Sequence, residues 1–111
     1  MSDKRIGKIQ YIAFGFGGYQ EAQIGISVTL GSDKESWGVG DFRGPWASDP
    51  DRYCKWTKEE QIQQSGETVM WLRDLLRDAK VNNINELKGI PVEVEFERMT
   101  LKSWRILTEV I

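Results

Sequence analysis

Two stretches of this chain alternate apolar and polar residues with a period of two, and no other feature constrains the fold as strongly. In residues 21–30 one face of an extended chain is apolar; its members are Ala22, Ile24, Ile26, Val28 and Leu30. In residues 90–97 three glutamates alternate with the apolar set, which is Val92, Val94 and Phe96. Successive side chains of a strand point to opposite faces of its sheet, so both stretches are predicted to be half-buried strands.

Three further segments are predicted to be strands. Residues 5–14 carry apolar residues on both faces, and residues 35–42 form a weaker strand that two glycines interrupt. Residues 100–111 form the last strand. Lys102 or Arg105 would then lie opposite the glutamates of the preceding strand, where unlike charges stabilise a sheet.

One main helix is predicted after the third strand. Thr57 and Glu60 have the spacing of a capping box, in which each side chain bonds a backbone N–H at the start of a helix. From Glu67 to Lys80 an apolar face follows helical spacing; its members are Val69, Leu72, Leu76 and Ala79. Ser65-Gly66 is expected to kink the helix or to separate a first short turn from it.

The predicted order is therefore β-β-β-α-β-β within residues 1–111, which are long enough for one domain. This order indicates an α+β fold with an antiparallel five-stranded sheet, or a small partly open barrel, and one main helix. The OB-fold also places its helix between the third and fourth strands, so an OB-like barrel is one form of this prediction. Residues 43–56 are a loop, and residues 81–89 contain one short helical turn closed by Gly89.

Composition argues against most enzyme classes. The chain has no histidine and a single cysteine, Cys54. Histidine is the usual general base near neutral pH and the commonest metal ligand, so no catalytic residue, metal site or cofactor is assigned. The net charge is −2, which gives no electrostatic reason to expect duplex DNA as a partner. We therefore expect a protein that is not an enzyme.

The N-terminal residues are charged and lack the apolar core of a signal peptide, and no apolar run is long enough to span a bilayer. We expect a cytoplasmic protein with no membrane partner. The last strand could pair with a second copy, so both a monomer and a homodimer remain open.

A glycine cluster, GFGG, follows the first predicted strand. A dinucleotide-binding loop needs a further glycine at position 20, where this chain has Gln20, and it needs a helix afterwards. The following residues alternate as a strand instead. Gly15, Gly17 and Gly18 are therefore predicted to form the corner between two antiparallel strands, and binding of a nucleotide or nucleotide signal is kept as an alternative function.

Aromatic residues gather in two places that are candidate binding sites. The loop region offers a candidate protein-binding set, which is Phe42, Arg43, Trp46, Tyr53 and Trp56. The same loop could instead cover one end of the core with its tryptophans. The first hairpin offers a candidate set for single-stranded nucleic acid, which is Tyr11, Phe14, Phe16 and Tyr19.

Several segments resemble a group of small proteins encoded by tailed bacteriophages and prophages; they are GFGGYQEAQIGIS, WGVGDFRGPW, LLRDAKV, LKGIPVEVEFE and LKSWRILTEVI. The resemblance extends over most of the chain, and its motifs are structural rather than catalytic. In one respect this chain departs from the group: we expect a Gly-Asn type of turn before the last strand, and the chain has Arg98-Met99. Those residues resist a positive φ, so a longer turn or another turn type is predicted.

The resemblance implies an accessory protein that acts on host or phage machinery in the bacterial cytoplasm. Together with the missing catalytic residues, it favours a non-enzymatic module that binds a protein partner. An OB-like protein that binds single-stranded nucleic acid is the second hypothesis, and a nucleotide-binding protein is the third.

Overall fold

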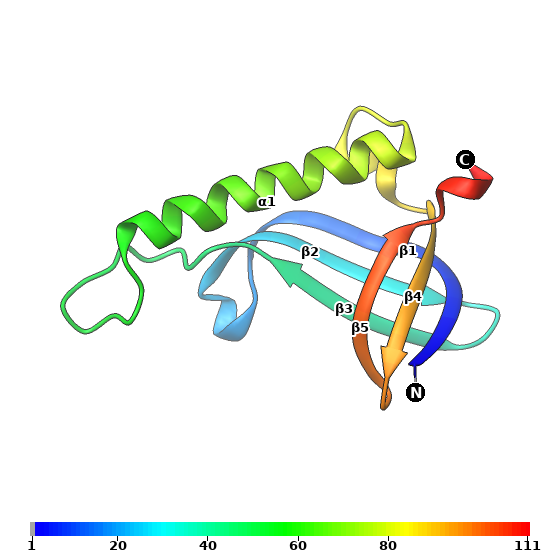
Figure 1. The fold of residues 1–111 in the computed structure, drawn as a ribbon, viewed down its shortest axis with the longest axis horizontal. Coiled ribbons are helices and arrows are strands. Elements are labelled where there is room, and N and C mark those ends of the chain that lie inside the picture. Colours follow the sequence, from blue (N-terminus) through cyan, green and yellow to red (C-terminus); the bar gives the residue numbers. More distant parts are fainter. Residues whose placement is uncertain (1) are drawn as a thin grey trace.

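The computed structural model describes residues 2–111 and has a single α-helix next to a five-stranded antiparallel sheet (Figure 1). The strands are β1 (Ser2–Gly17), β2 (Gln23–Ser32), β3 (Trp37–Arg43), β4 (Pro91–Glu97) and β5 (Thr100–Ile106). Helix α1 (Lys58–Ala79) lies between β3 and β4 in the chain. The sheet order is β3-β2-β1-β4-β5. The prediction of an α+β fold with one main helix and a partly open barrel is confirmed.

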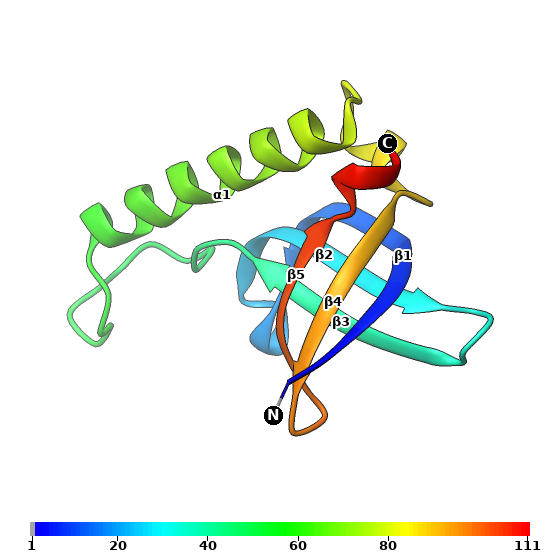
Figure 2. The same ribbon diagram turned by 45° about the vertical axis from the view of Figure 1, so that its right-hand side comes forward.

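Strand β1 is central because it pairs with two different strands along its length. Its second half pairs with β2 and its first half with β4, and Lys8 lies opposite both Gly31 and Pro91. A β-bulge between Ile9 and Tyr11 marks this changeover. Bulges bend a strand and increase its twist. As a result the sheet curls into a half-barrel, with β4 and β5 crossing in front of β2 and β3 (Figure 2).

Side chains draw the two edge strands of this half-barrel together. The indole N–H of Trp104 on β5 donates to Asp41 Oδ2 on β3 at 2.8 Å. Trp37 on β3 packs edge-to-face against Phe96 on β4, with ring centroids 5.6 Å apart. Within residues 2–111 no backbone ladder joins β3 to β5, so side chains alone span the opening.

The core lies between the concave face of the sheet and α1. Its buried apolar residues come from every strand except β3, from α1 and from the turn after it; they are Ile9, Ile26, Val28, Leu30, Leu75, Ala79, Leu87, Val92, Val94 and Ile106. The alternation predicted in β2 and β4 is confirmed, because Val28 and Val94 are buried and their sequence neighbours are more exposed. The 3₁₀-helix at Ile84–Leu87 confirms the short helical turn and buries Leu87 completely.

Helix α1 begins as predicted, and its Thr57 side chain accepts a hydrogen bond from the Glu60 N–H at 3.2 Å. The expected interruption at Ser65-Gly66 is wrong, because the helix is continuous from Lys58 to Ala79. The Ser65 hydroxyl donates to the Gln61 carbonyl one turn earlier at 2.8 Å, so the serine is satisfied inside the helix.

The predicted apolar face of the helix is only partly right. Val69 is 60% exposed, whereas Thr68, Leu75 and Ala79 are buried. The buried face therefore runs through Thr68 and Leu75 and is turned away from Val69. The hydroxyl of Thr68 is compatible with burial because it donates to the Gln64 carbonyl at 2.8 Å.

Strand β5 is shorter than predicted, and its register is shifted. It ends at Ile106, and Thr108–Val110 form a 3₁₀-helix. Opposite charges pair as expected, with Arg105 3.2 Å from Glu93 and Lys102 3.8 Å from Glu95. A bulge in the β4–β5 ladder between Glu95 and Phe96 places Lys102 beside the glutamates.

The end of the chain is held by a bidentate ion pair. Arg105 donates two hydrogen bonds to Glu109, at 2.9 and 2.7 Å. These bonds lower the pKa of Glu109 to about 2 and raise the pKa of the Arg105 guanidinium. The carboxylate therefore stays charged, and the pair stays intact, down to pH values well below the usual titration range of glutamate.

Candidate binding surfaces

The glycine cluster lies in a β-hairpin. Gly15 and Gly17 are ladder residues of β1, opposite Gly25 and Gln23, so the predicted corner is confined to the next residues. Gly18 has φ 72°, and a Cβ there would collide with the side chain of Gln23. The chain then turns through a 3₁₀-helix at Tyr19–Glu21 into β2. No α-helix follows the glycines before β2, so the segment lacks the geometry of a phosphate-binding loop.

The aromatic residues of this hairpin are exposed but do not share one face. Phe14 and Phe16 lie opposite Ile26 and Ile24 and therefore project from the concave face of the sheet. Tyr11 lies opposite Thr29, on the convex face. The set predicted to stack single-stranded nucleic acid is thus divided between the two faces of the sheet.

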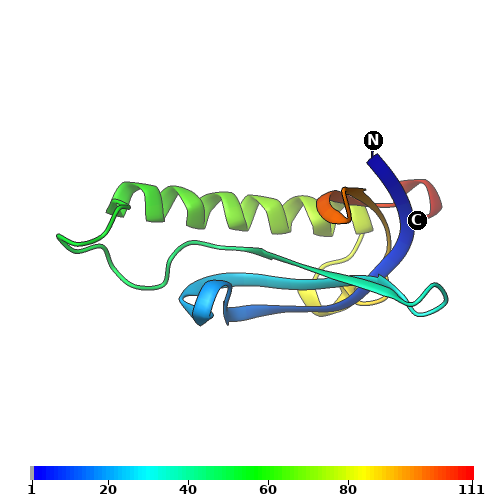
Figure 3. The ribbon, with the colours of Figure 1, turned by 90° about the horizontal axis from the view of Figure 1, so that it is seen from below.

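On the concave face of the sheet, side chains of β2 are buried, whereas those at the C-terminal end of β1 are exposed. Ile26 is fully buried, whereas its neighbour Phe14 is 60% exposed and Phe16 is 72% exposed. Tyr19, at the corner of the hairpin, is also more than half exposed. Figure 3 shows the reason: α1 forms a separate layer, and the β1–β2 hairpin lies on the far side of β3 from the helix.

This aromatic surface is almost free of charge. Between Gln10 and Ile24 the sequence contains one charged residue, Glu21. Phe14 and Phe16 therefore form an exposed aromatic pair with no cation in their own segment, and the exposed Tyr19 lies at the end of the same hairpin. We call these three residues the hairpin surface.

Two of the loop tryptophans predicted to bind a partner instead hold the loop in place. Trp46 and Trp56 stack on each other, with ring centroids 5.2 Å apart and planes 19° apart. The Trp46 carbonyl accepts a hydrogen bond from the Gln61 amide of α1 at 2.8 Å. Trp46 also bridges to Gln23 of β2. Both indoles are half-buried, so these contacts tie the loop to the helix and the sheet.

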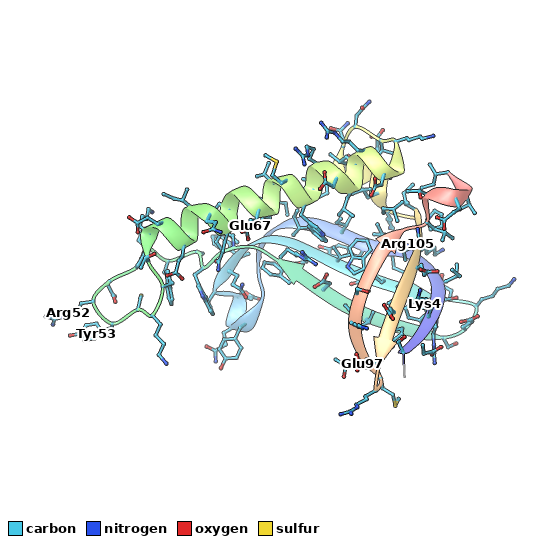
Figure 4. The ribbon with its side chains drawn as sticks, in the orientation of Figure 1. Lys4, Arg52, Tyr53, Glu67, Glu97 and Arg105 are labelled. Atoms are coloured by element: carbon cyan, nitrogen blue, oxygen red, sulfur yellow. The ribbon has the colours of Figure 1, made fainter. Side chains whose placement is uncertain are left out.

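The other three loop candidates point in different directions. Phe42 lies against Gly17 on the convex face, where a Cβ on the glycine would be 2.8 Å from the ring. Arg43 lies on the concave side, 4.8 Å above the ring of Trp71. Tyr53 is 78% exposed at the tip of the loop beside Arg52, far from the sheet (Figure 4). The five residues therefore do not form one surface.

A cavity that the sequence analysis missed lies at the other end of the half-barrel. It has a volume of about 250 Å³ and is lined by Asp3, Arg5, Trp37, Gly38, Phe96, Arg98 and Met99. We call it the mouth cavity. Its lining comes from the start of β1, the start of β3, and the end of β4 with the turn that follows it. These segments are far apart in the sequence. Only the unusual turn residues Arg98-Met99 could have drawn attention to it.

That turn corrects a prediction. Glu97 and Thr100 are paired, so the turn has two residues, and Arg98 and Met99 have φ values of 53° and 66°. Two consecutive left-handed residues are the conformation of a type I′ turn, for which Asn-Gly is preferred. The turn is therefore the short type that these residues were expected to avoid.

The part of the chain that the structure describes shows no geometry typical of a metal site or of a membrane-spanning helix. Residues 2–111 contain no group of three or more side chains suited to hold a metal ion. Nor do they contain a helix with the length and apolar character needed to cross a membrane. Cys54 is half-buried, and its sulfur lies 3.5 Å from a carboxylate oxygen of Asp51.

No family model, no curated protein and no solved structure matches this chain. The function is therefore inferred from the hairpin surface and the mouth cavity.

Proposed function

We propose that the chain is a non-enzymatic protein-binding module that contacts its partner through the hairpin surface. The observation that carries this proposal is the exposure of Phe14 and Phe16 on the concave face, where Ile26 and Val28 of the adjacent strand β2 are buried. Exposed aromatic clusters of this kind mark interaction sites on soluble proteins.

The chemistry of the hairpin surface suits a protein partner. Centres of protein interfaces are enriched in aromatic residues and depleted of charge. Phe14 and Phe16 are two residues apart on one strand, so their side chains are about 7 Å apart on the same face. Ile24 lies opposite Phe16 and extends the apolar area. Such a surface would bury aromatic rings against a partner without leaving a charge desolvated.

The resemblance to proteins of tailed phages and prophages supplies a setting for this activity. In that setting the module is an accessory protein of the bacterial cytoplasm, and its partner is a host or phage protein. The lack of histidine supports a role in binding rather than in acid–base catalysis.

Truncation of the hairpin surface tests the proposal. Proteins captured from a bacterial host lysate are quantified for the parent protein, for Phe16→Ala and for Tyr53→Ala as a matched control at an exposed aromatic. We expect Phe16→Ala to lower capture of a specific partner by roughly 30-fold, the effect of losing an interface hot spot of about 2 kcal/mol. Tyr53→Ala should leave capture unchanged. The opposite pattern would move the interface to the loop, and equal capture by all three proteins would contradict the proposal.

Single-stranded nucleic acid is the second candidate, because exposed aromatic rings can also stack on bases. The charge of the segment argues against it, since Glu21 is the only charged residue between Gln10 and Ile24. Titration of the protein with oligonucleotides at low salt separates the two functions. Tryptophan quenching that weakens as salt rises would favour nucleic acid, and no quenching would favour a protein partner.

A further inference from the structure

The walls of the mouth cavity are aromatic. Trp37 and Phe96 meet at an interplanar angle of 87°, so the edge of one ring packs against the face of the other in the cavity wall. Its volume of about 250 Å³ is below the range typical of drug-sized ligands. The cavity therefore suits one ring or two fused rings. Figure 2 shows the backbone around it: the start of β1 and the β4–β5 turn lie side by side, below β3 in that view.

Among the side chains that line the cavity, one positive charge is in surplus; just outside this lining, the Trp37 indole N–H donates to the Glu35 carboxylate at 3.3 Å. Arg5 is already paired, because its Nε lies 2.9 Å from Asp3 Oδ2 and its guanidinium lies 5.6 Å from the Phe96 centroid. Arg98 forms no ion pair and no side-chain hydrogen bond with any other residue in the range 2–111. Its guanidinium therefore remains available to a ligand at the rim.

The backbone at the rim is also unusual. A left-handed conformation costs a residue with a side chain roughly 1–2 kcal/mol, and Arg98 and Met99 both adopt it. Met99 is 97% exposed, so its side chain gives almost no packing energy in return. Strained residues of this kind concentrate at ligand sites, where the side chain they present is useful.

We propose that the mouth cavity binds a small aromatic anion, namely a flat ring that carries a carboxylate or a phosphate ester. The ring lies against Trp37 and Phe96, and Met99 covers its outer face with a polarisable thioether. The anionic group is held by the fork of the Arg98 guanidinium, which matches carboxylate and phosphate geometry. This site is at the opposite end of β1 from the hairpin surface and does not depend on the proposed protein partner.

Amide NMR titration of the whole protein tests the proposal with probes of matched shape. The probes are 2-naphthoate, its neutral analogue 2-naphthamide, and phenyl phosphate. We expect 2-naphthoate to shift the Trp37 indole N–H and the Gly38 amide saturably, with an affinity at least fivefold above that of the amide. A saturable shift with phenyl phosphate would assign phosphate esters to the same site.

The variant Arg98→Gln tests how much the positive charge of Arg98 contributes to anion binding. Because Arg98 is exposed and unpaired among the described residues, the variant should give the spectrum of a folded protein. We expect it to bind the anions at least fivefold more weakly and 2-naphthamide with unchanged affinity, while Arg52→Gln on the distant loop behaves like the parent protein. The proposal is overturned if neither anion shifts these signals, or if Arg98→Gln binds both anions as tightly as the parent.

Discussion

At the scale of single residues, the β4–β5 turn contains two residues whose types do not favour the backbone conformation they adopt. Arg98 and Met99 occupy a two-residue turn with φ of 53° and 66°. Asn-Gly adopts these angles with little strain, whereas arginine and methionine do not. The turn therefore lowers stability while it places a guanidinium and a thioether at the mouth cavity.

Replacing Arg98-Met99 by Asn-Gly should raise stability. We expect the free energy of unfolding in urea to increase by about 1–2 kcal/mol, because the strain of the left-handed residues is relieved. The same double variant should lose the binding of 2-naphthoate. Arg52→Asn is a suitable control, since it changes an exposed arginine outside the turn. A double variant no more stable than the parent would show that the turn is not strained.

The structural roles of some single residues could be predicted directly from the sequence. Thr57 and Glu60 predict the start of α1 because capping depends only on local spacing. Gln20 excludes a dinucleotide fingerprint for the same reason. The mouth cavity could not be predicted, because it joins Arg5, Trp37 and Phe96, and no local rule brings these three together.

At the scale of elements, α1 shows that tertiary packing decides which of its apolar residues are buried. Val69 and Leu75 are both plausible core residues by composition, but only Leu75 faces the sheet. Thr68 is buried although it is polar, because its hydroxyl is satisfied by the preceding turn of helix. The helix therefore turns a mixed face to the core and leaves Val69 in solvent.

Paired substitutions in α1 test this orientation. We expect Leu75→Ala to lower the free energy of unfolding by about 2–4 kcal/mol, because it leaves a cavity beside the core. Val69→Ala should change it by less than about 0.5 kcal/mol, as expected for a surface site. Thermal or urea denaturation measures both. Comparable losses at the two positions would mean that the helix is rotated from its observed orientation.

The strands differ in how far they could be predicted. The period-two pattern identifies β2 and β4 because one face of each is buried. It does not reveal the bulge in the β4–β5 ladder, which shifts the register between Glu95 and Phe96. It also extends the last strand beyond Ile106, where the pairing with β4 ends and the Arg105–Glu109 ion pair holds a 3₁₀-helix instead.

At the scale of the whole molecule, side-chain contacts connect the two edge strands of the sheet, which no backbone hydrogen bonds join within residues 2–111. Trp104 and Asp41 join β5 to β3, which are the two edges of the sheet. Trp71 of α1 packs edge-to-face on Trp104, with centroids 5.7 Å apart. The Trp104 indole therefore contacts both the helix and the opposite edge strand of the sheet.

Trp104→Phe should weaken this closure. We expect the free energy of unfolding to fall by about 1–3 kcal/mol, because the half-buried Asp41 carboxylate loses a charge-assisted hydrogen bond. Trp71→Phe is the matched control: it removes a similar volume, and the Trp71 indole makes no hydrogen bond to the rest of residues 2–111. Equal losses in the two variants would assign the effect to packing rather than to the hydrogen bond.

The dual pairing of β1 has a consequence for the order of folding. The half of β1 that pairs with β2 finds its partner across a short turn, whereas the half that pairs with β4 must wait until most of the chain has been synthesised. Contacts between distant parts of a chain form late because closing a long loop costs entropy. We therefore expect the β1–β2–β3 meander to form before β4 and β5 join the sheet. In this order the mouth cavity, whose lining includes the first half of β1 and the β4–β5 turn, is completed late in folding.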